Sequence, residues 1–231
     1  MCGRFTLRTP APALIEHFQL GRDAFEQLEL FAPRYNIAPT QQIGAVRASD
    51  GVRTWSWLRW GLIPSWTKSL TSSRPLINAR SETVAEKPSF RTSFKRRRCL
   101  IPADGFYEWH VEGKGKQPYH IHLPDDQLFA FAGLWEWWGG PDKKLKSIES
   151  CTLLTTAANK TMQPIHDRMP VIIQPVDYDL WLDPDIEDPQ RLDHLLRPSE
   201  DVELQLVPVD SHVNRPSHDD PECVEPIAPA E

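Results

Sequence analysis

Residues 98–109 read RCLIPADGFYEW. The run is rich in apolar and aromatic residues and predicts a β-strand over residues 99–109. Similar short runs lie on both sides of it, and 22 prolines and 11 glycines punctuate the chain around them. Because proline and glycine mark turns between short strands, the chain is predicted to be rich in β-structure.

The other elements are predicted from the same patterns. Further strands are expected over residues 3–7, 42–47, 54–60, 119–123, 129–135, 150–155, 170–173 and 202–208. Helices are expected over residues 10–18, 81–86, 176–182 and 189–196, where the start signals and apolar spacing suit a helix. The predicted fold class is α+β, a single β-rich domain with a mixed, partly barrel-like sheet and a few peripheral helices.

Length and composition favour one soluble domain, since a chain of 231 residues can bury one sizeable core. The N-terminus does not resemble a signal peptide, and no apolar run approaches the roughly 20 residues that span a bilayer. We therefore expect a cytoplasmic protein without a membrane partner. Residues 211–231 are Pro-rich and acidic and are expected to form an extended, partly ordered terminal segment.

Charge is unevenly distributed along the chain. The net charge is −6, yet residues 1–100 carry 16 basic against 7 acidic side chains, whereas residues 101–231 carry 10 against 25. This asymmetry predicts a basic surface built by the first part of the chain. The sharpest basic cluster, KRRR at residues 95–98, suits a phosphate contact and a solvated strand entry equally well.

The cysteines are few and widely spaced, at Cys2, Cys99, Cys151 and Cys223. Without any CxxC pair they argue against a disulfide framework and a structural zinc site. His120 and His122 would face the same side of a predicted strand, but no third ligand is evident. The sequence predicts neither a metal nor an organic cofactor.

Cys2 directly follows the initiator methionine. Removal of Met1 would leave an α-amine that titrates near about 8 and a thiol that titrates near about 8.5, on adjacent carbons. These two groups can attack one aldehyde in turn, first forming an imine and then closing a thiazolidine ring. Cys2 is therefore the candidate nucleophile.

Seven segments in order resemble one family, the SOS response-associated peptidase (SRAP) family of abasic-site processing proteins. They are MCGRF (1–5), RYNIAPT (34–40), WGLIPSW (60–66), NARSET (78–83), RCLIPADGFYEW (98–109), FAGLWE (131–136) and IHDRMPVI (165–172). The resemblance covers nearly the whole chain and implies a domain over residues 1–226, followed by a short tail at 227–231.

The resemblance implies covalent capture of abasic sites in single-stranded DNA through Cys2, as a thiazolidine crosslink that protects the lesion during the DNA damage (SOS) response. It implies that Glu108 acts as general acid/base, that His166 assists proton transfer, and that Asn78 orients Cys2 or the sugar. From the residues alone, Glu108 suits a solvent-facing strand position, His166 a polar loop and Asn78 a helix cap.

A single strand is expected to meet cationic side chains and an aromatic platform. Arg4, Arg80 and Arg168 are predicted to contact phosphate or sugar, and Trp66 to stack against the bases that flank the lesion. The resemblance adds further site-lining residues, Asn36, Pro39 and Thr155. A monomer is the simplest expectation, with replication or repair proteins as further candidate partners.

Two alternative functions and one side reaction are considered beside covalent capture. An N-terminal-nucleophile amidohydrolase or peptidase, including one that removes its own Met1, would also depend on Cys2, although the arginine-rich run of the glutaminases is absent. Strand cleavage by a lyase reaction would compete at the imine stage. A noncovalent single-strand binder would leave Cys2 incidental, so that Cys2→Ala would retain all function.

Overall fold

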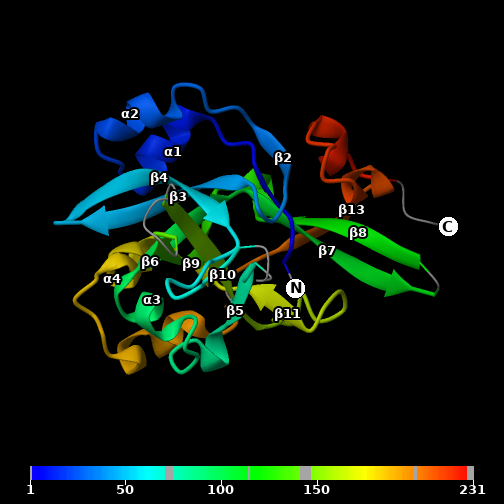
Figure 1. The fold of residues 1–231 in the computed structure, drawn as a ribbon. Coiled ribbons are helices and arrows are strands. Elements are labelled where there is room, and N and C mark those ends of the chain that lie inside the picture. Colours follow the sequence, from blue (N-terminus) through cyan, green and yellow to red (C-terminus); the bar gives the residue numbers. More distant parts are fainter. Residues whose placement is uncertain (1, 71–74, 114, 141–146, 200–201, 228–231) are drawn as a thin grey trace.

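The computed structural model describes residues 2–70, 75–113, 115–140, 147–199 and 202–227 (Figure 1). Its strands are β1 (Phe5–Leu7), β2 (Arg34–Ile37), β3 (Gln42–Ser49), β4 (Val52–Trp60), β5 (Asn78–Arg80), β6 (Arg98–Ala103), β7 (Gly105–Glu112), β8 (Gly115–His122), β9 (Phe129–Trp138), β10 (Ile148–Ala157), β11 (Arg168–Pro170), β12 (Ile172–Ile173) and β13 (Gln205–Pro208). The α-helices are α1 (Ala11–Phe18), α2 (Asp23–Leu28), α3 (Arg91–Arg96) and α4 (Tyr178–Leu182). Short 3₁₀ helices are η1 (Ser81–Thr83), η2 (Pro124–Asp126), η3 (Pro175–Asp177), η4 (Pro189–Leu196), η5 (Ser211–Asn214) and η6 (Pro221–Val224).

The larger sheet closes on itself. Its strand order is β11-β10-β4-β3-β6-β9-β12, and β9 also pairs antiparallel with β10, from Ile148 opposite Trp138 to Leu153 opposite Gly133. Strand β5 pairs in parallel with β10 from Leu153 to Thr155, at the end of β10 that extends beyond its pairing with β9. The α+β class and the partly barrel-like sheet are therefore confirmed.

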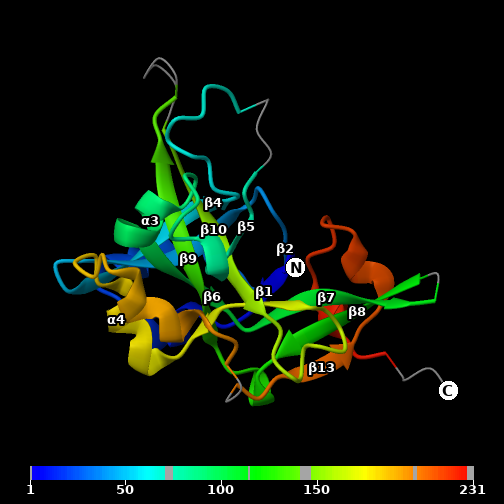
Figure 2. The same ribbon diagram turned by 90° about the horizontal axis from the view of Figure 1, so that it is seen from below.

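A second sheet with the order β13-β8-β7-β1-β2 packs against this ring (Figure 2). The contact between the two sheets is aromatic, since the Phe5 ring lies 5.3 Å from that of Trp60 and 5.8 Å from that of Phe131. Edge-on contacts of this kind add to the area that the rings bury. The first residues of the chain consequently lie at the junction of the two sheets.

The strand predicted over residues 99–109 is two strands, one in each sheet. They break at Asp104, whose carboxylate accepts hydrogen bonds from the backbone N–H groups of Arg8 (2.5 Å) and Thr9 (2.8 Å). Gly105 follows because a Cβ there would lie 2.1 Å from Nε2 of His120. A buried carboxylate that binds the segment after β1 thus diverts the chain from one sheet to the other.

The strand predicted over residues 170–173 is also divided. Val171 donates its N–H to the Leu154 carbonyl (2.9 Å) and accepts from the Ala132 N–H (2.8 Å), so it crosses from β10 to β9. The helix predicted over residues 81–86 is the single turn η1, and residues 189–196 form 3₁₀ rather than α turns. Among the described residues, the strands β2 and β5, the helices α2 and α3, and the turns η2, η5 and η6 were not predicted.

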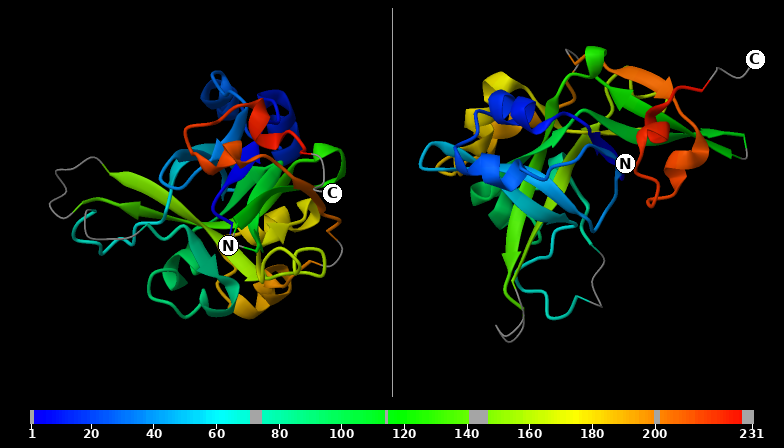
Figure 3. Two further views of the ribbon diagram at one scale, coloured as in Figure 1. Left: turned by 90° about the vertical axis from the view of Figure 1, so that its right-hand side faces the viewer. Right: turned by 90° about the horizontal axis from the view of Figure 1, so that it is seen from above.

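The acidic terminal segment is more ordered than predicted up to residue 227, because η5 and η6 dock beside β2 (Figure 3). The Asp219 carboxylate accepts from the N–H groups of Tyr35 (2.6 Å) and Asn36 (2.9 Å) and pairs with Arg34. Within the described parts of the chain, no helix is long and apolar enough to cross a membrane.

Candidate active site

Strand pairing places Cys2 at the junction of the sheets. Phe5 of β1 lies opposite Phe106 of β7, and the Tyr107 N–H donates to the Arg4 carbonyl at 3.0 Å. Residues 2–4 therefore continue along β7 near Glu108. Cys2 is completely buried, with Sγ 3.6 Å from the Arg4 carbonyl oxygen.

Asn78 holds the backbone of Cys2. Its side-chain amide donates a 2.8 Å hydrogen bond to the Cys2 carbonyl, across 76 residues of sequence. Asn78 is the first residue of β5, and Arg80, not Asn78, occupies the position before the η1 turn. The helix-cap interpretation therefore does not hold, because the Asn78 amide is directed to the start of the chain.

Glu108 is buried in β7, with 3% of its surface exposed. The solvent-facing interpretation is thus wrong. Burial raises the pKa of the Cys2 thiol far above its usual value, and the Glu108 carboxylate raises it further. The two side chains therefore act on each other electrostatically, and the thiol is protonated at neutral pH in this arrangement.

Three neighbouring strands bring further predicted residues to one edge of the ring. In β10, Thr155 lies opposite Arg80 of β5 and Pro170 of β11, while Ala157 lies opposite Arg168. Arg80 is exposed, whereas Thr155 is completely buried. Figure 1 shows β5, β10 and β11 close to the start of the chain.

His166 lies in the turn before β11. Its Nδ1 accepts from the Arg168 N–H at 2.9 Å and lies 2.7 Å from an Asp167 carboxylate oxygen. One ring nitrogen is therefore within reach of a backbone donor and of a carboxylate acceptor.

Arg168 is bound to its surroundings through its guanidinium. Nη1 and Nη2 contact the two Glu82 carboxylate oxygens at 2.5 and 3.0 Å, and Nη2 also donates to the Thr155 carbonyl at 2.7 Å. The Arg168 side chain is 13% exposed and that of Glu82 is 49% exposed. Arg168 is thus fixed at the site, with a carboxylate on its outer side.

Arg4 and Asn36 connect the start of the chain to the terminal segment. Arg4 Nη1 donates to the Asn36 side-chain oxygen (2.7 Å) and to the Val213 carbonyl (2.9 Å). The Asn36 amide nitrogen donates to the carbonyls of Val213, Arg215 and His218. Asn36 is completely buried, so in this structure its side chain supports Arg4. Pro39, three residues further along, is half-buried.

Trp66 is 56% exposed and borders a hollow of about 440 Å³. Arg91 and Arg97 line the same hollow. Arg97 is paired with Glu136, which also lines the hollow, so the exposed indole beside Arg91 is the surface on which a base can stack while its phosphate meets a cation.

A family model described as SOS response associated peptidase (SRAP) matches residues 1–216. The chain belongs to the SRAP family.

Among similar proteins, the abasic site processing protein YoqW of Bacillus subtilis (strain 168) is 42% identical over 97% of this chain and 99% of its own length. The abasic site processing protein HMCES of Gallus gallus is 32% identical over 85% of this chain and 67% of its own length. A crystal structure of a protein from Bacteroides thetaiotaomicron superposes with a TM-score of 0.86, at 26% identity, over 98% of this chain and all of that one.

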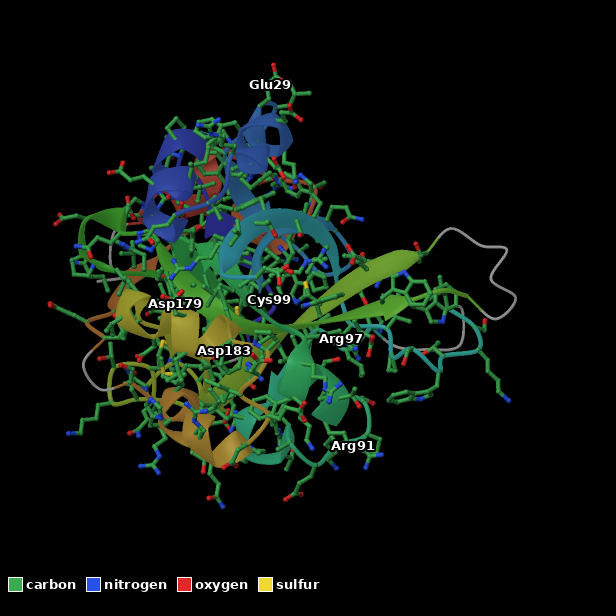
Figure 4. The ribbon with its side chains drawn as sticks, turned by 90° about the vertical axis from the view of Figure 1, so that its left-hand side faces the viewer. Glu29, Arg91, Arg97, Cys99, Asp179 and Asp183 are labelled. Atoms are coloured by element: carbon green, nitrogen blue, oxygen red, sulfur yellow. The ribbon has the colours of Figure 1, made fainter. Side chains whose placement is uncertain are left out.

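The basic run at residues 95–98 has largely structural roles in this SRAP chain. Arg98 is buried and donates to the carbonyls of Trp181 (2.6 Å), Phe94 (2.6 Å), Lys95 (2.8 Å) and Asp183. Burial lowers its pKa to about 10. Arg96 pairs with Glu187 and Arg97 with Glu136. Figure 4 shows this side of the molecule, with Arg91 at the start of α3 and Arg97 directly after its end.

Potential metal ligands gather in two places. His120 and His122 stack with ring centroids 5.0 Å apart, but His122 is bound to Asp126 and the Leu123 carbonyl. In the part of the SRAP chain that the structure describes, one group of three offers ligand atoms within 4.8 Å of one another, namely His212, Asp220 and Cys223. All four cysteines are buried, unpaired thiols.

Sequence reasoning missed the role of Glu82 and of the segment that contacts Arg4. Glu82 belongs to NARSET, one of the segments that resemble the SRAP family, but nothing local indicates that it pairs with an arginine 86 residues away. Residues 213–218 contact Asn36 through backbone carbonyls. Every residue has such a carbonyl, so the residue types in this segment do not indicate the contact.

Proposed function

We propose that this SRAP protein captures abasic sites in single-stranded DNA covalently, through Cys2 after removal of Met1. Two findings support the proposal. Relatives that align over nearly the whole chain are named abasic site processing proteins. The observation that carries it is the anchoring of the Cys2 backbone by Asn78, beside a buried Glu108 that acts electrostatically on the thiol.

The reaction needs two nucleophiles on one residue. The Cys2 amine adds to the C1′ aldehyde of the ring-opened sugar, and loss of water leaves an imine. The thiol then adds to the imine carbon, so that a C–S bond forms and the thiol proton ends on the nitrogen. Because both groups belong to Cys2, the second step is intramolecular and gains from proximity.

The buried thiol determines the order of these steps. In the proposed order the amine attacks first, because burial and the Glu108 charge both raise the pKa of the thiol and favour its neutral form. We assign Glu108 to the proton transfers of sugar opening, imine formation and ring closure. His166 assists near the same carbon, because its Nδ1 lies between a donor and an acceptor.

The strand is held by the cationic residues around this centre. Arg80 is exposed two residues after Asn78, while Arg4 and Arg168 are already held by protein groups. Trp66 supplies a stacking surface for bases beside the lesion. We assign a domain over residues 1–226 to this function; strand cleavage and peptidase activity would be side reactions of the same centre.

A denaturing gel tests the proposal. Purified protein, shown by mass spectrometry to lack Met1, is mixed with single-stranded DNA that carries one abasic site. We expect a slowly migrating adduct that forms only with the lesion and is lost in Cys2→Ala. Cys151→Ala, which removes another completely buried thiol, is the matched control and should retain the adduct.

Cys2→Ser separates the two steps. This variant keeps the amine but lacks the thiol, so it should give an adduct that does not survive heating and more strand nicking. A heat-stable adduct with Cys2→Ser would overturn the thiazolidine assignment. No adduct with the parent would overturn covalent capture itself and favour the amidohydrolase or plain DNA-binding function.

A further inference from the structure

The Arg168–Glu82 pair has the geometry of an arginine bound to an oxyanion. Both terminal nitrogens of the guanidinium contact the carboxylate, at 2.5 and 3.0 Å. A DNA phosphate can bind the same edge of a guanidinium in the same bidentate manner. A phosphate and the Glu82 carboxylate therefore compete for one position on Arg168.

Arg168 is the fixed partner of this pair. Its Nη2 donates to the Thr155 carbonyl at 2.7 Å, its backbone N–H donates to His166, and its side chain is 13% exposed. Glu82 instead lies on the three-residue turn η1, with 49% of its side chain exposed. Movement of the carboxylate therefore needs less rearrangement than movement of the guanidinium.

Glu82 also interacts with a second cation of the site. The hydrogen bond to Arg168 is the main cause that lowers its pKa, and the charge of Arg80 lowers it further. Glu82 is thus ionised at neutral pH and offsets positive charge from two of the three arginines assigned to the strand.

We propose that Glu82 is a built-in counterion of the phosphate-binding arginines and that a phosphate of the single strand replaces its carboxylate on Arg168. The inference rests on the proposed function, because it assigns Arg168 to the DNA backbone. Glu82 is then a specificity-determining residue that weakens binding of strands unable to place a phosphate at Arg168.

The test measures equilibrium binding without crosslinking. In a Cys2→Ala background, fluorescence anisotropy gives the Kd for single-stranded DNA that carries a tetrahydrofuran abasic analogue, at several salt concentrations. Glu82→Gln should bind more tightly, on the order of fivefold at low salt, because a competing charge is removed. The slope of log K against log salt should stay nearly the same, because a phosphate contacts Arg168 in both proteins and only the competing carboxylate differs.

Two variants control the experiment. Glu149→Gln makes the same change of charge at another bidentate pair, with Arg47 at 2.9 and 2.6 Å, and should leave Kd almost unchanged. Glu82→Asp retains the charge and should bind like the parent. Weaker binding by Glu82→Gln, or the same change in Glu149→Gln, would overturn the counterion role. Failure of the proposed function is separate, since it would appear as absence of an adduct in the protein that retains Cys2.

Discussion

Glu108 combines a carboxylate with almost complete burial, next to the residue proposed as nucleophile. Carboxylates in such positions are usually retained for a chemical task, because burying a charge costs free energy. Its strand provides a comparison, since Glu112 ends β7 with an exposed side chain. The same residue type in one strand therefore occupies a buried and a solvated environment.

This contrast gives a prediction for the proposed proton transfer. Glu108→Gln should lower the rate of crosslink formation by about 100-fold or more, the usual contribution of general acid/base catalysis. Glu112→Gln should react at the parent rate. Single-turnover gel assays measure both rates, and the Kd for intact single-stranded DNA should be unchanged. Equal rates for Glu108→Gln and the parent would exclude Glu108 from the rate-limiting proton transfer.

At the level of single residues, the family resemblance was more informative than local pattern. Strand alternation favoured an exposed Glu108, and capping preference favoured Asn78 as a helix cap. Both were wrong because the partners of these side chains come from the start of the chain, far away in sequence. The catalytic roles themselves stay predictions.

Secondary-structure elements were also harder to predict where long-range partners, and not the local pattern, define them. The long strands β3, β4, β9 and β10 were predicted because their apolar patterns extend over many residues. Strands β2 and β5 contain four and three residues, so they have too little pattern to detect, and pairing with neighbours defines them. The break at Asp104 was missed because the N–H groups of Arg8 and Thr9, which its carboxylate binds, are 96 and 95 residues away in the sequence.

Arg98 gives a prediction about how elements are joined. Its guanidinium joins the end of α3 to α4 through four backbone carbonyls. Lys cannot satisfy these acceptors with one ammonium group, so Arg98→Lys should lower the free energy of unfolding by roughly 2–4 kcal/mol. Urea unfolding measures this loss, and binding of single-stranded DNA should not change.

Arg80→Lys is the matched variant, because Arg80 is exposed beside Asn78. It should leave the unfolding free energy within about 0.5 kcal/mol of the parent and weaken DNA binding. If Arg98→Lys instead weakened binding and left the stability unchanged, the run at residues 95–98 would belong to the DNA surface.

Acid stability is a property of the whole molecule to which His120 contributes. Burial lowers the pKa of His120 to about 3, with smaller contributions from Arg8 and His122. The unfolded chain takes up a proton near pH 6.5, whereas the folded protein does so only near pH 3. The stabilising effect is therefore complete above pH 6.5 and is lost as the pH falls toward 3.

We expect His120 to account for a loss of about 2 kcal/mol of unfolding free energy between pH 7 and pH 5. Urea unfolding at the two pH values measures it, and the difference should be smaller in His120→Gln. His122→Gln is the control, because its ring stacks on His120 but is less buried. An identical pH dependence in the parent and His120→Gln would contradict this account.

The contacts of Arg4 and Asn36 with residues 213–218 also determine when the proposed site can be completed during translation. Asn36 and Val213 are 177 positions apart, and Arg4 and Val213 are 209 apart. Domains tend to fold from the N-terminus as the ribosome delivers them, so Cys2 is made long before the groups that fix Arg4. A nascent chain therefore carries the cysteine without the completed surface beside it, and translation must pass residue 218 before the proposed site has all its parts.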